Sequence, residues 1–282
     1  MNADAEGGAV AGGARIPGES VAGKVFALLD AFAGDRTELT LGELCRATGL
    51  PGSTAHRLVG QLVRWGGLER TPEGSYRVGI HLWEIATRSP SSQGLREIAM
   101  PYLQDLYDVT KEHVQLAVPD GTEALLVEKI SERSAVDTVG RAGDRLPLHA
   151  SAVGKAILAF ADVETQENAL RVPLDAYTAR TITSGVRLRA ELAHVRRVGF
   201  ALSEEELTVG AVSCAAPVLD AQGGVVAAVS VVVAGGMGVA SGWAGAVRTA
   251  ATGISRRLRS DLSLQPLRAR RALLGRPTPP SH

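Results

Sequence analysis

Residues 40–78 constrain the fold more than any other stretch of this chain. Thr40 and Glu43 stand three positions apart, a spacing at which each side chain can cap a backbone N–H group at a helix start. Gly49 supplies the left-handed residue that ends a helix, and Pro51 suits the first turn of the next one. The pattern predicts two helices joined by a turn of three to four residues, which is the helix-turn-helix geometry that enters a DNA major groove.

The second of these helices has one apolar face and one face of hydrogen-bonding groups. Ala55, Leu58, Val59 and Leu62 recur at helical spacing and predict the buried side. The opposite side presents the residues that we expect to face DNA: Ser53, Thr54, His56, Arg57, Gln61 and Arg64.

A hairpin signal follows at once. Two short strand-like runs over residues 68–78 flank a turn at Pro72, Glu73 and Gly74, which predicts a wing. Arg70 and Arg77 of this wing are expected on DNA phosphates. Two amphipathic helices around a glycine also occur in all-helical domains. The wing, the His and Arg on the outer face, and five Arg against three Glu over residues 41–77 favour DNA binding.

Length and composition limit the number of domains and the possible classes of function. A length of 282 residues allows two domains, and no stretch approaches the roughly 18 apolar residues of a membrane helix. Net charge is zero, so DNA binding must come from a local patch. Cys45 and Cys214 lie in apolar periodic settings, which predicts buried free thiols and a reducing cytoplasm.

Periodicity divides the chain into five parts. A Gly- and Ala-rich leader predicted to be disordered covers residues 1–19, and the DNA-binding part covers 20–88, starting with a helix over 20–33 that Ser20 can cap. Ser89 to Ser92 break the pattern. A helix kinked at Pro101 is expected as a linker over 89–111, and an Arg-rich tail predicted to be disordered covers 261–282.

The part over residues 112–260 alternates with the period of strands. Strands are predicted over 113–118, 123–130, 135–139, 211–219 and 225–234, with a turn at 119–121, and helices over 151–160, 190–198 and up to about Arg259. Antiparallel strands with helices packed on them make an α+β domain.

Several candidate catalytic patterns fail. Residues 149–155 look like a phosphate-binding loop, but the first Gly is missing and Ala156 replaces the Ser or Thr. Glu204 to Glu206 are interpreted as a solvated charge run, and Gly235 to Gly238 as a flexible connector. The six histidines lack metal-ligand spacing, and no Ser sits in a nucleophile-elbow pattern. We expect no metal, no cofactor and no enzymatic activity.

One feature favours small-molecule binding. Residues 146–151 lead into a helix whose first turn is Ala152, Val153 and Gly154, and small residues there expose backbone N–H groups that attract an anion. Ser213 and Ser230 are placed to face the same cavity. The alternative is that Ser151 only caps the helix and the serines only fill strands.

The segments 146–159 (LPLHASAVGKAILA), 199–218 (GFALSEEELTVGAVSCAAPV) and 41–58 (LGELCRATGLPGSTAHRL) together resemble the IclR family of bacterial transcriptional regulators. The resemblance covers residues 20–259. It implies a winged helix-turn-helix domain, a linker helix and an effector-binding domain of GAF-like antiparallel α+β fold. It also implies a homodimer or a dimer of dimers.

The resemblance also carries over an effector site. Its residues here would be Ala152, Val153, Ser203, Ala211, Ser213, Ser230 and Val232. Ser203, Ser213 and Val232 stand where members that bind small keto acids carry Asp, Cys and Ser, so this pocket is expected to be less polar.

The resulting hypothesis is a cytoplasmic, ligand-responsive regulator, more readily a repressor than an activator. It would bind a pseudo-palindromic double-stranded DNA operator as a homodimer, respond to a small organic effector such as a carboxylic acid, and have no membrane partner. The competing hypothesis is a small-molecule-binding or weakly catalytic domain with an N-terminal protein-interaction module.

Overall fold

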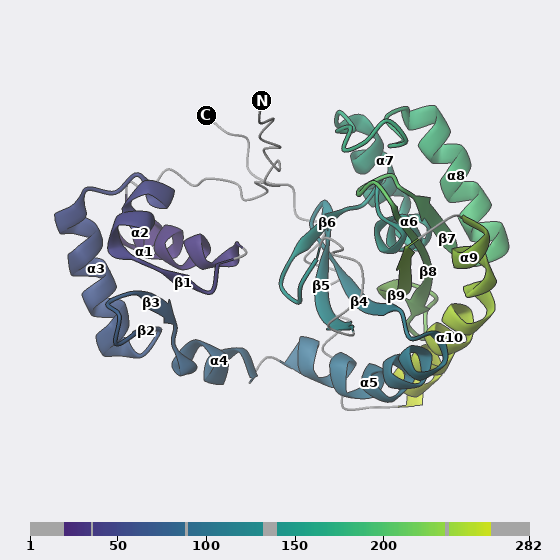
Figure 1. Ribbon diagram of the computed structural model, residues 1–282. Coiled ribbons are helices and arrows are strands. Elements are labelled where there is room, and N and C mark those ends of the chain that lie inside the picture. The colour runs from purple at the N-terminus through teal and green to yellow at the C-terminus, as the bar shows by residue number, and fades with distance from the viewer. Residues whose placement is uncertain (1–19, 35, 88–89, 132–139, 235–236, 261–282) are drawn as a thin grey trace, which may run out of the picture. The chain divides into compact units, whose positions relative to one another are not determined.

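The computed structural model describes residues 20–34, 36–87, 90–131, 140–234 and 237–260 (Figure 1). The chain divides into two compact units, residues 1–89 and 90–282. The predicted leader, tail and strand over 135–139 lie outside the described residues.

The first unit packs helices against a small antiparallel sheet of strand order β1-β3-β2. Its elements are α1 (Val21–Asp30), the 3-10 turn η1 (Ala31–Ala33), β1 (Glu38–Leu39), α2 (Leu41–Thr48), α3 (Gly52–Trp65), β2 (Leu68–Arg70), β3 (Tyr76–Val78) and α4 (Ile80–Thr87). The helix-turn-helix and its wing are therefore confirmed. Strand β1, which is only two residues long, was not predicted.

Local hydrogen bonding and backbone conformation explain where α2 begins and ends. Thr40 accepts a hydrogen bond from the Glu43 N–H while the Glu43 carboxylate accepts one from the Thr40 N–H, so the predicted capping box is present. Gly49 ends α2 at φ 71°, a left-handed conformation that costs a residue with a side chain more than it costs glycine. Leu44, Leu58 and Leu62 then close the core of this unit.

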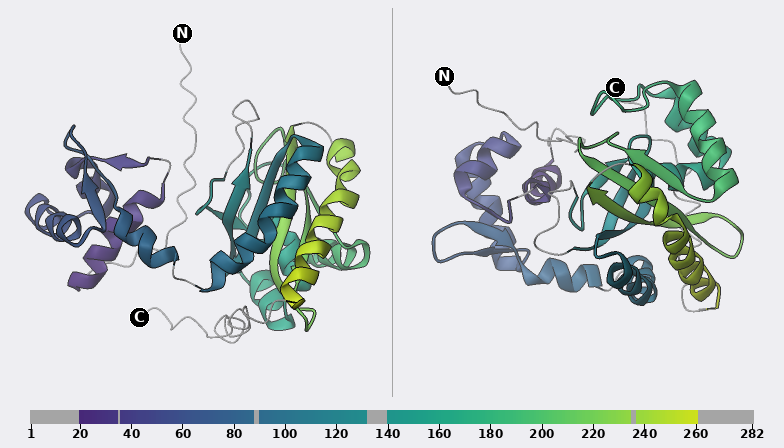
Figure 2. Two further views of the ribbon diagram at one scale, coloured as in Figure 1. Left: turned by 90° about the horizontal axis from the view of Figure 1, so that it is seen from below. Right: turned by 45° about the vertical axis from the view of Figure 1, so that its right-hand side comes forward.

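The second unit is a six-stranded antiparallel sheet with helices on both faces (Figure 2). The strands follow the order β6-β5-β4-β9-β8-β7. Its elements are α5 (Pro90–Thr110), β4 (His113–Asp120), β5 (Glu123–Ile130), β6 (Arg145–Pro147), α6 (Ala152–Phe160), α7 (Val163–Arg171), α8 (Gly185–Val198), β7 (Ala201–Glu204), β8 (Ala211–Leu219), β9 (Val225–Ala234), α9 (Met237–Gly242) and α10 (Ala244–Ser260).

Strand alternation gives this sheet two apolar faces. Val212, Cys214, Val229 and Val231 pack with α5 and α10 on one side. The alternate positions, such as Ala215 and Ala228, pack under α6 and α8 on the other side. Because both faces are covered, the strands read as long apolar runs.

Some boundaries differ from prediction. The helix expected as a linker starts at Pro90, a residue suited to a first helical turn, and is counted with the second unit because Leu95, Leu103 and Leu106 are buried in its core. Strand β4 runs through Pro119 to Asp120, so the turn begins two residues later than predicted.

Two more predictions about local structure were wrong. The segment read as a flexible connector enters helix α9 at Met237. Helix α8 begins at Gly185, five residues before the predicted start, because Ser184 caps the Arg187 N–H. Helix α7 was missed.

Candidate functional site

The outer face of α3 is exposed as predicted. Ser53, His56, Arg57, Gln61 and Arg64 are exposed, Thr54 is partly exposed, and Ala55, Leu58, Val59 and Leu62 are buried. Among the described residues, no ion pair involves Arg57, Arg64 or the wing residue Arg70. Their guanidinium groups are available for an external anion.

The start of α3 differs from the starts of α2, α6 and α8. Pro51 occupies the N-cap and makes no side-chain hydrogen bond, whereas Thr40, Ser151 and Ser184 all cap their helices. The first N–H groups of α3 therefore keep their hydrogen-bonding capacity. A helix start of this kind favours phosphate.

The two wing arginines are not equivalent. Arg77 donates from Nε and Nη2 to Glu69 Oε2, at 3.0 and 2.9 Å. Hydrogen bonding from Arg77, helped by the Ile80 N–H, lowers the pKa of Glu69, so this carboxylate keeps the charge that neutralises Arg77. Arg70 extends toward the turn at Gly74 without such a partner.

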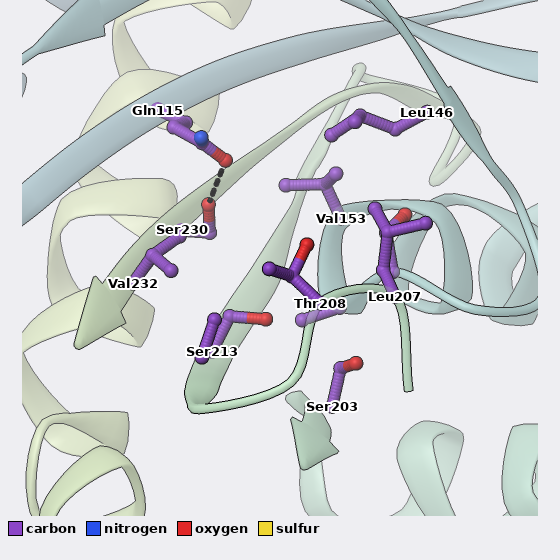
Figure 3. Close-up of a pocket in the computed structure, with 12 residues that line it drawn as sticks. Gln115, Leu146, Val153, Ser203, Leu207, Thr208, Ser213, Ser230 and Val232 are labelled. Atoms are coloured by element: carbon purple, nitrogen blue, oxygen red, sulfur yellow. Dashed lines mark hydrogen bonds between the residues drawn. The ribbon is translucent and has the colours of Figure 1, made fainter. Parts of the chain in front are cut away.

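A pocket opens on the face of the second-unit sheet that carries α6 (Figure 3). It has an empty volume of about 430 Å³, part of it open to solvent. All seven residues carried over from the family resemblance line it. Five further lining residues were not predicted to do so: Gln115, Leu146, Ser151, Leu207 and Thr208.

Strand register brings the lining residues together. Ser203 on β7 pairs with Ser213 on β8, which pairs with Val232 on β9, so the three form one row across the sheet. Ser230 lies two residues before Val232 on the same face and pairs with Gln115 on β4.

The first turn of α6 leaves two backbone donors over this pocket. Ser151 Oγ accepts from the Gly154 N–H at 3.1 Å, and the described residues supply no acceptor to the N–H groups of Ala152 and Val153. Gly154 lets the first turn of α6 approach the Leu148 backbone closely, because a Cβ at position 154 would lie 2.5 Å from Leu148 Cα. Ser151 caps the helix, as the alternative reading expected, and it also lines the pocket.

The hydroxyl groups of the pocket serines differ in their surroundings and hydrogen-bond partners. Ser203 donates to the Ala150 carbonyl at 3.0 Å, which ties β7 to the segment before α6. Ser230 donates to Gln115 Oε1 at 3.3 Å (Figure 3). Ser213 is only partly buried and lies at the pocket wall.

The reading of Glu204 to Glu206 as a solvated run was wrong at Glu206. This residue is 7% exposed, and its Oε1 lies 2.5 Å from Lys155 Nζ, which is 1% exposed. Burial raises the pKa of Glu206, although the Lys155 ammonium opposes that shift. The hydrophobic periodicity of the sequence could not predict this ion pair, because Lys155 and Glu206 are 51 residues apart.

The described part of the chain was also compared with what a metal site and a membrane-spanning helix require. It holds no group of three or more His, Cys, Asp or Glu arranged around a metal-sized space. None of its helices is both long and apolar enough to cross a membrane.

Family models match both units. The model "IclR helix-turn-helix domain" matches residues 21–72, and "Bacterial transcriptional regulator IclR C-terminal" matches residues 87–256, more than half of the chain. This chain belongs to the IclR family. It is therefore a DNA-binding, ligand-responsive transcriptional regulator rather than an enzyme.

Two relatives that are named as transcriptional regulators match most of this chain. The transcriptional regulator XynR of Escherichia coli is 34% identical over 210 residues, spanning 73% of this chain and 83% of XynR. The transcriptional repressor IclR of the same organism is 32% identical over 208 residues, spanning 72% of this chain and 76% of the repressor.

Solved structures share the fold. An IclR homolog of Microbacterium hydrocarbonoxydans, crystallised with 4-hydroxybenzoate, has a TM-score of 0.78 and 35% identity, and the match covers 84% of this chain and 98% of that one. The Thermotoga maritima IclR structure has a TM-score of 0.69 and 28% identity, covering 83% and 97%.

Proposed function

We propose that this protein is a cytoplasmic repressor that binds a pseudo-palindromic operator as a homodimer and changes its DNA affinity when a small carboxylic acid enters the α6 pocket. The proposal rests on one binding feature in each unit: the exposed outer face of α3, and the two unpartnered N–H groups of α6 in the pocket. Two modules are needed because one recognition helix makes few base contacts.

The DNA-reading residues are those on the outer face of α3. Ser53, Thr54, His56, Arg57, Gln61 and Arg64 face the major groove, and Arg57 donates two hydrogen bonds to a guanine. The first-turn N–H groups of α3, Arg70 and, more weakly, Arg77 contact phosphates. Residues 20–88 make up the DNA-binding domain and 112–260 the effector domain.

The effector lies with its carboxylate at the N–H groups of Ala152 and Val153, where the helix dipole favours negative charge. Ala211 and Val232 contact its body, and Ser203, Ser213 and Ser230 surround it. The Microbacterium relative crystallised with 4-hydroxybenzoate, an aromatic carboxylate, and we extend that chemical class to this chain.

The test is a gel shift and footprint of the full chain on the DNA upstream of its own gene. We expect a retarded complex and a protected site with two-fold symmetry. A protein-interaction module would give no specific complex. Protection of one asymmetric half-site at saturation would contradict the homodimer.

A further inference from the structure

Helix α10 has four arginines and no acidic side chain. The side chains of Arg248, Arg256, Arg257 and Arg259 are exposed, and none of them forms an ion pair with a residue that the structure describes. The whole chain has 30 basic and 30 acidic residues, so these four charges are a local excess on a balanced molecule. The outer side of α10 is therefore positively charged.

Three of the four arginines share one face of the helix. Arg248, Thr252, Arg256 and Arg259 follow one another at intervals of four, four and three residues, which place side chains on the same side of a helix. We call these four residues the α10 stripe. The opposite side of α10 packs on the sheet next to α5 through residues such as Ile254 (Figure 2). At the rise of an α-helix the stripe is about 16 Å long.

The neighbouring turn does not neutralise the α10 stripe. The Leu219 N–H donates to Ser255 Oγ at 2.9 Å, which places the turn between β8 and β9 beside the C-terminal half of α10. The acidic residue of that turn, Asp220, accepts hydrogen bonds from the N–H groups of Gln222 and Gly224, both at 2.8 Å. Because its carboxylate is bonded within its own turn, the guanidinium groups keep their capacity for an external anion.

Helix stability accounts for only part of this charge. The helix dipole favours cations in the last turn, where Arg257 and Arg259 lie. Arg248 is in the N-terminal half, where the dipole of α10 gives a cation no stabilisation, and it lies beside Gly199 at the end of α8 without a hydrogen bond to any described residue. Other exposed arginines of the second unit have a carboxylate partner: Arg96 with Glu128, Arg145 with Asp120 and Arg189 with Glu167.

A row of unpaired guanidinium groups fits a ligand with regularly repeated negative charge. Duplex DNA carries about one negative charge per 1.7 Å of its axis, so several phosphates fall within the length of the α10 stripe. Arginine donates two parallel hydrogen bonds to phosphate oxygens, and the exposed Thr252 hydroxyl is a further donor. Contacts to phosphates carry no sequence information, in contrast to the base contacts proposed for α3.

We propose that the α10 stripe is a second DNA-binding surface, which contacts the phosphates of duplex DNA without reading their sequence. The proposed function places every DNA contact in the first unit, and this inference adds one from the second unit. The consequence is a gain in affinity that is the same for the operator and for any other duplex.

The test is anisotropy of labelled DNA with the full-length protein at several salt concentrations. One long duplex has a scrambled sequence, and a second of the same length contains the operator. Arg256→Gln combined with Arg259→Gln should reduce the slope of log K against log salt by about 2 on both duplexes, since each phosphate contact releases about one counterion. Adding Arg248→Gln should reduce the slope by about 1 more. The ratio of the two affinities should stay at its wild-type value.

The controls separate a local contact from a change in charge or in folding. Arg171→Gln combined with Arg187→Gln removes the same charge from exposed positions on α7 and α8, and should leave the slope unchanged. Lysine at positions 256 and 259 should keep the wild-type slope, because it retains the charge. Melting curves report folding. Arg256→Gln alone leaves the last turn intact, should reduce the slope by about 1, and keeps the proposal testable if the double variant is unstable.

An unchanged slope for the folded glutamine variants overturns the proposal. An equal reduction by the control on α7 and α8 also overturns it, because net charge alone would then explain the effect. An unchanged slope together with a smaller assembly in sedimentation velocity would assign the α10 stripe to contact with a second copy of the chain instead of DNA.

Discussion

Lys155 Nζ lies 2.5 Å from Glu206 Oε1 in the interior of the second unit. Lys155 belongs to the helix whose first turn carries the free N–H groups, and Glu206 directly precedes Leu207 and Thr208 of the pocket wall. The Thr181 hydroxyl also donates to the Glu206 carbonyl at 2.6 Å. The ion pair therefore ties the loop that closes one side of the pocket to the helix that supplies its anion site.

Removing one member of this pair should be costly. Lys155→Met leaves the Glu206 carboxylate buried without its cation, and a broken buried pair costs about 3 kcal/mol or more. We expect a lower melting temperature for the second unit, measured by calorimetry. Lys155→Met combined with Glu206→Leu should recover much of the loss, and a single variant as stable as wild type would show that the pair contributes nothing.

The same variant should respond to pH in a defined direction. The pKa of Glu206 is already raised by burial, and loss of Lys155 raises it further. The unfolded chain releases this proton near the ordinary glutamate pKa of 4.5, whereas the folded chain, whose Glu206 pKa is raised, holds it to higher pH. The free energy of unfolding of Lys155→Met should therefore fall as pH rises from about 4.5 toward neutrality, relative to wild type. A difference that stays constant with pH would contradict this assignment.

Arg57 gives the sharpest test of the α3 face. Arg57→Ala should weaken operator binding by about 1–3 kcal/mol while leaving the fold intact, because the side chain is exposed and is proposed to bond a base edge. Arg187→Ala is the charge-matched control, since Arg187 is exposed on α8 of the other unit. Fluorescence anisotropy measures both, and equal operator affinities would refute the assigned face.

The wing arginines should differ in their salt dependence. Arg70→Ala should lower the slope of log K against log salt by about 1, since a free guanidinium releases roughly one counterion. Arg77→Ala should lower it less, because Glu69 already neutralises Arg77. Glu69→Gln should raise it. If Arg77→Ala changes the slope as much as Arg70→Ala, the Arg77–Glu69 pair opens on DNA.

The capping box should stabilise the first unit. Thr40→Ala should cost about 1 kcal/mol in urea unfolding, whereas the exposed Thr37→Ala should cost little. Hydrogen bonds from Thr40, first the backbone N–H, lower the pKa of Glu43 to about 2. Thr40→Ala keeps the backbone N–H but removes the hydrogen bond that the Thr40 hydroxyl donates to Glu43 Oε2 at 2.8 Å. The difference should therefore shrink as pH falls from about 4.5 to about 2, because Glu43 becomes protonated. A pH-independent cost would contradict a contribution from this hydroxyl bond.

Local signals predicted the first unit well. The cap at Thr40, the left-handed Gly49 and the alternating faces of α3 act within a few residues, so the sequence alone indicates them. The buried Lys155–Glu206 pair could not be predicted in this way, because charged residues are mostly exposed and this contact depends on tertiary packing. Gln115 was missed for a similar reason, since only the register of β4 with β9 places it beside Ser230.

We propose that an acid bound at the start of α6 controls operator affinity. The most direct measurement is anisotropy of labelled operator DNA with full-length protein during titration with 4-hydroxybenzoate, comparing wild type, Ala152→Pro and Ala152→Val. Pro is tolerated at a first helical position after the extended Ser151, so Ala152→Pro loses an N–H group without breaking α6, and Ala152→Val adds bulk but keeps that group. All three should bind the operator without acid, and only Ala152→Pro should lose the release seen with wild type. Full release from Ala152→Pro, or no release from wild type, would contradict the claim.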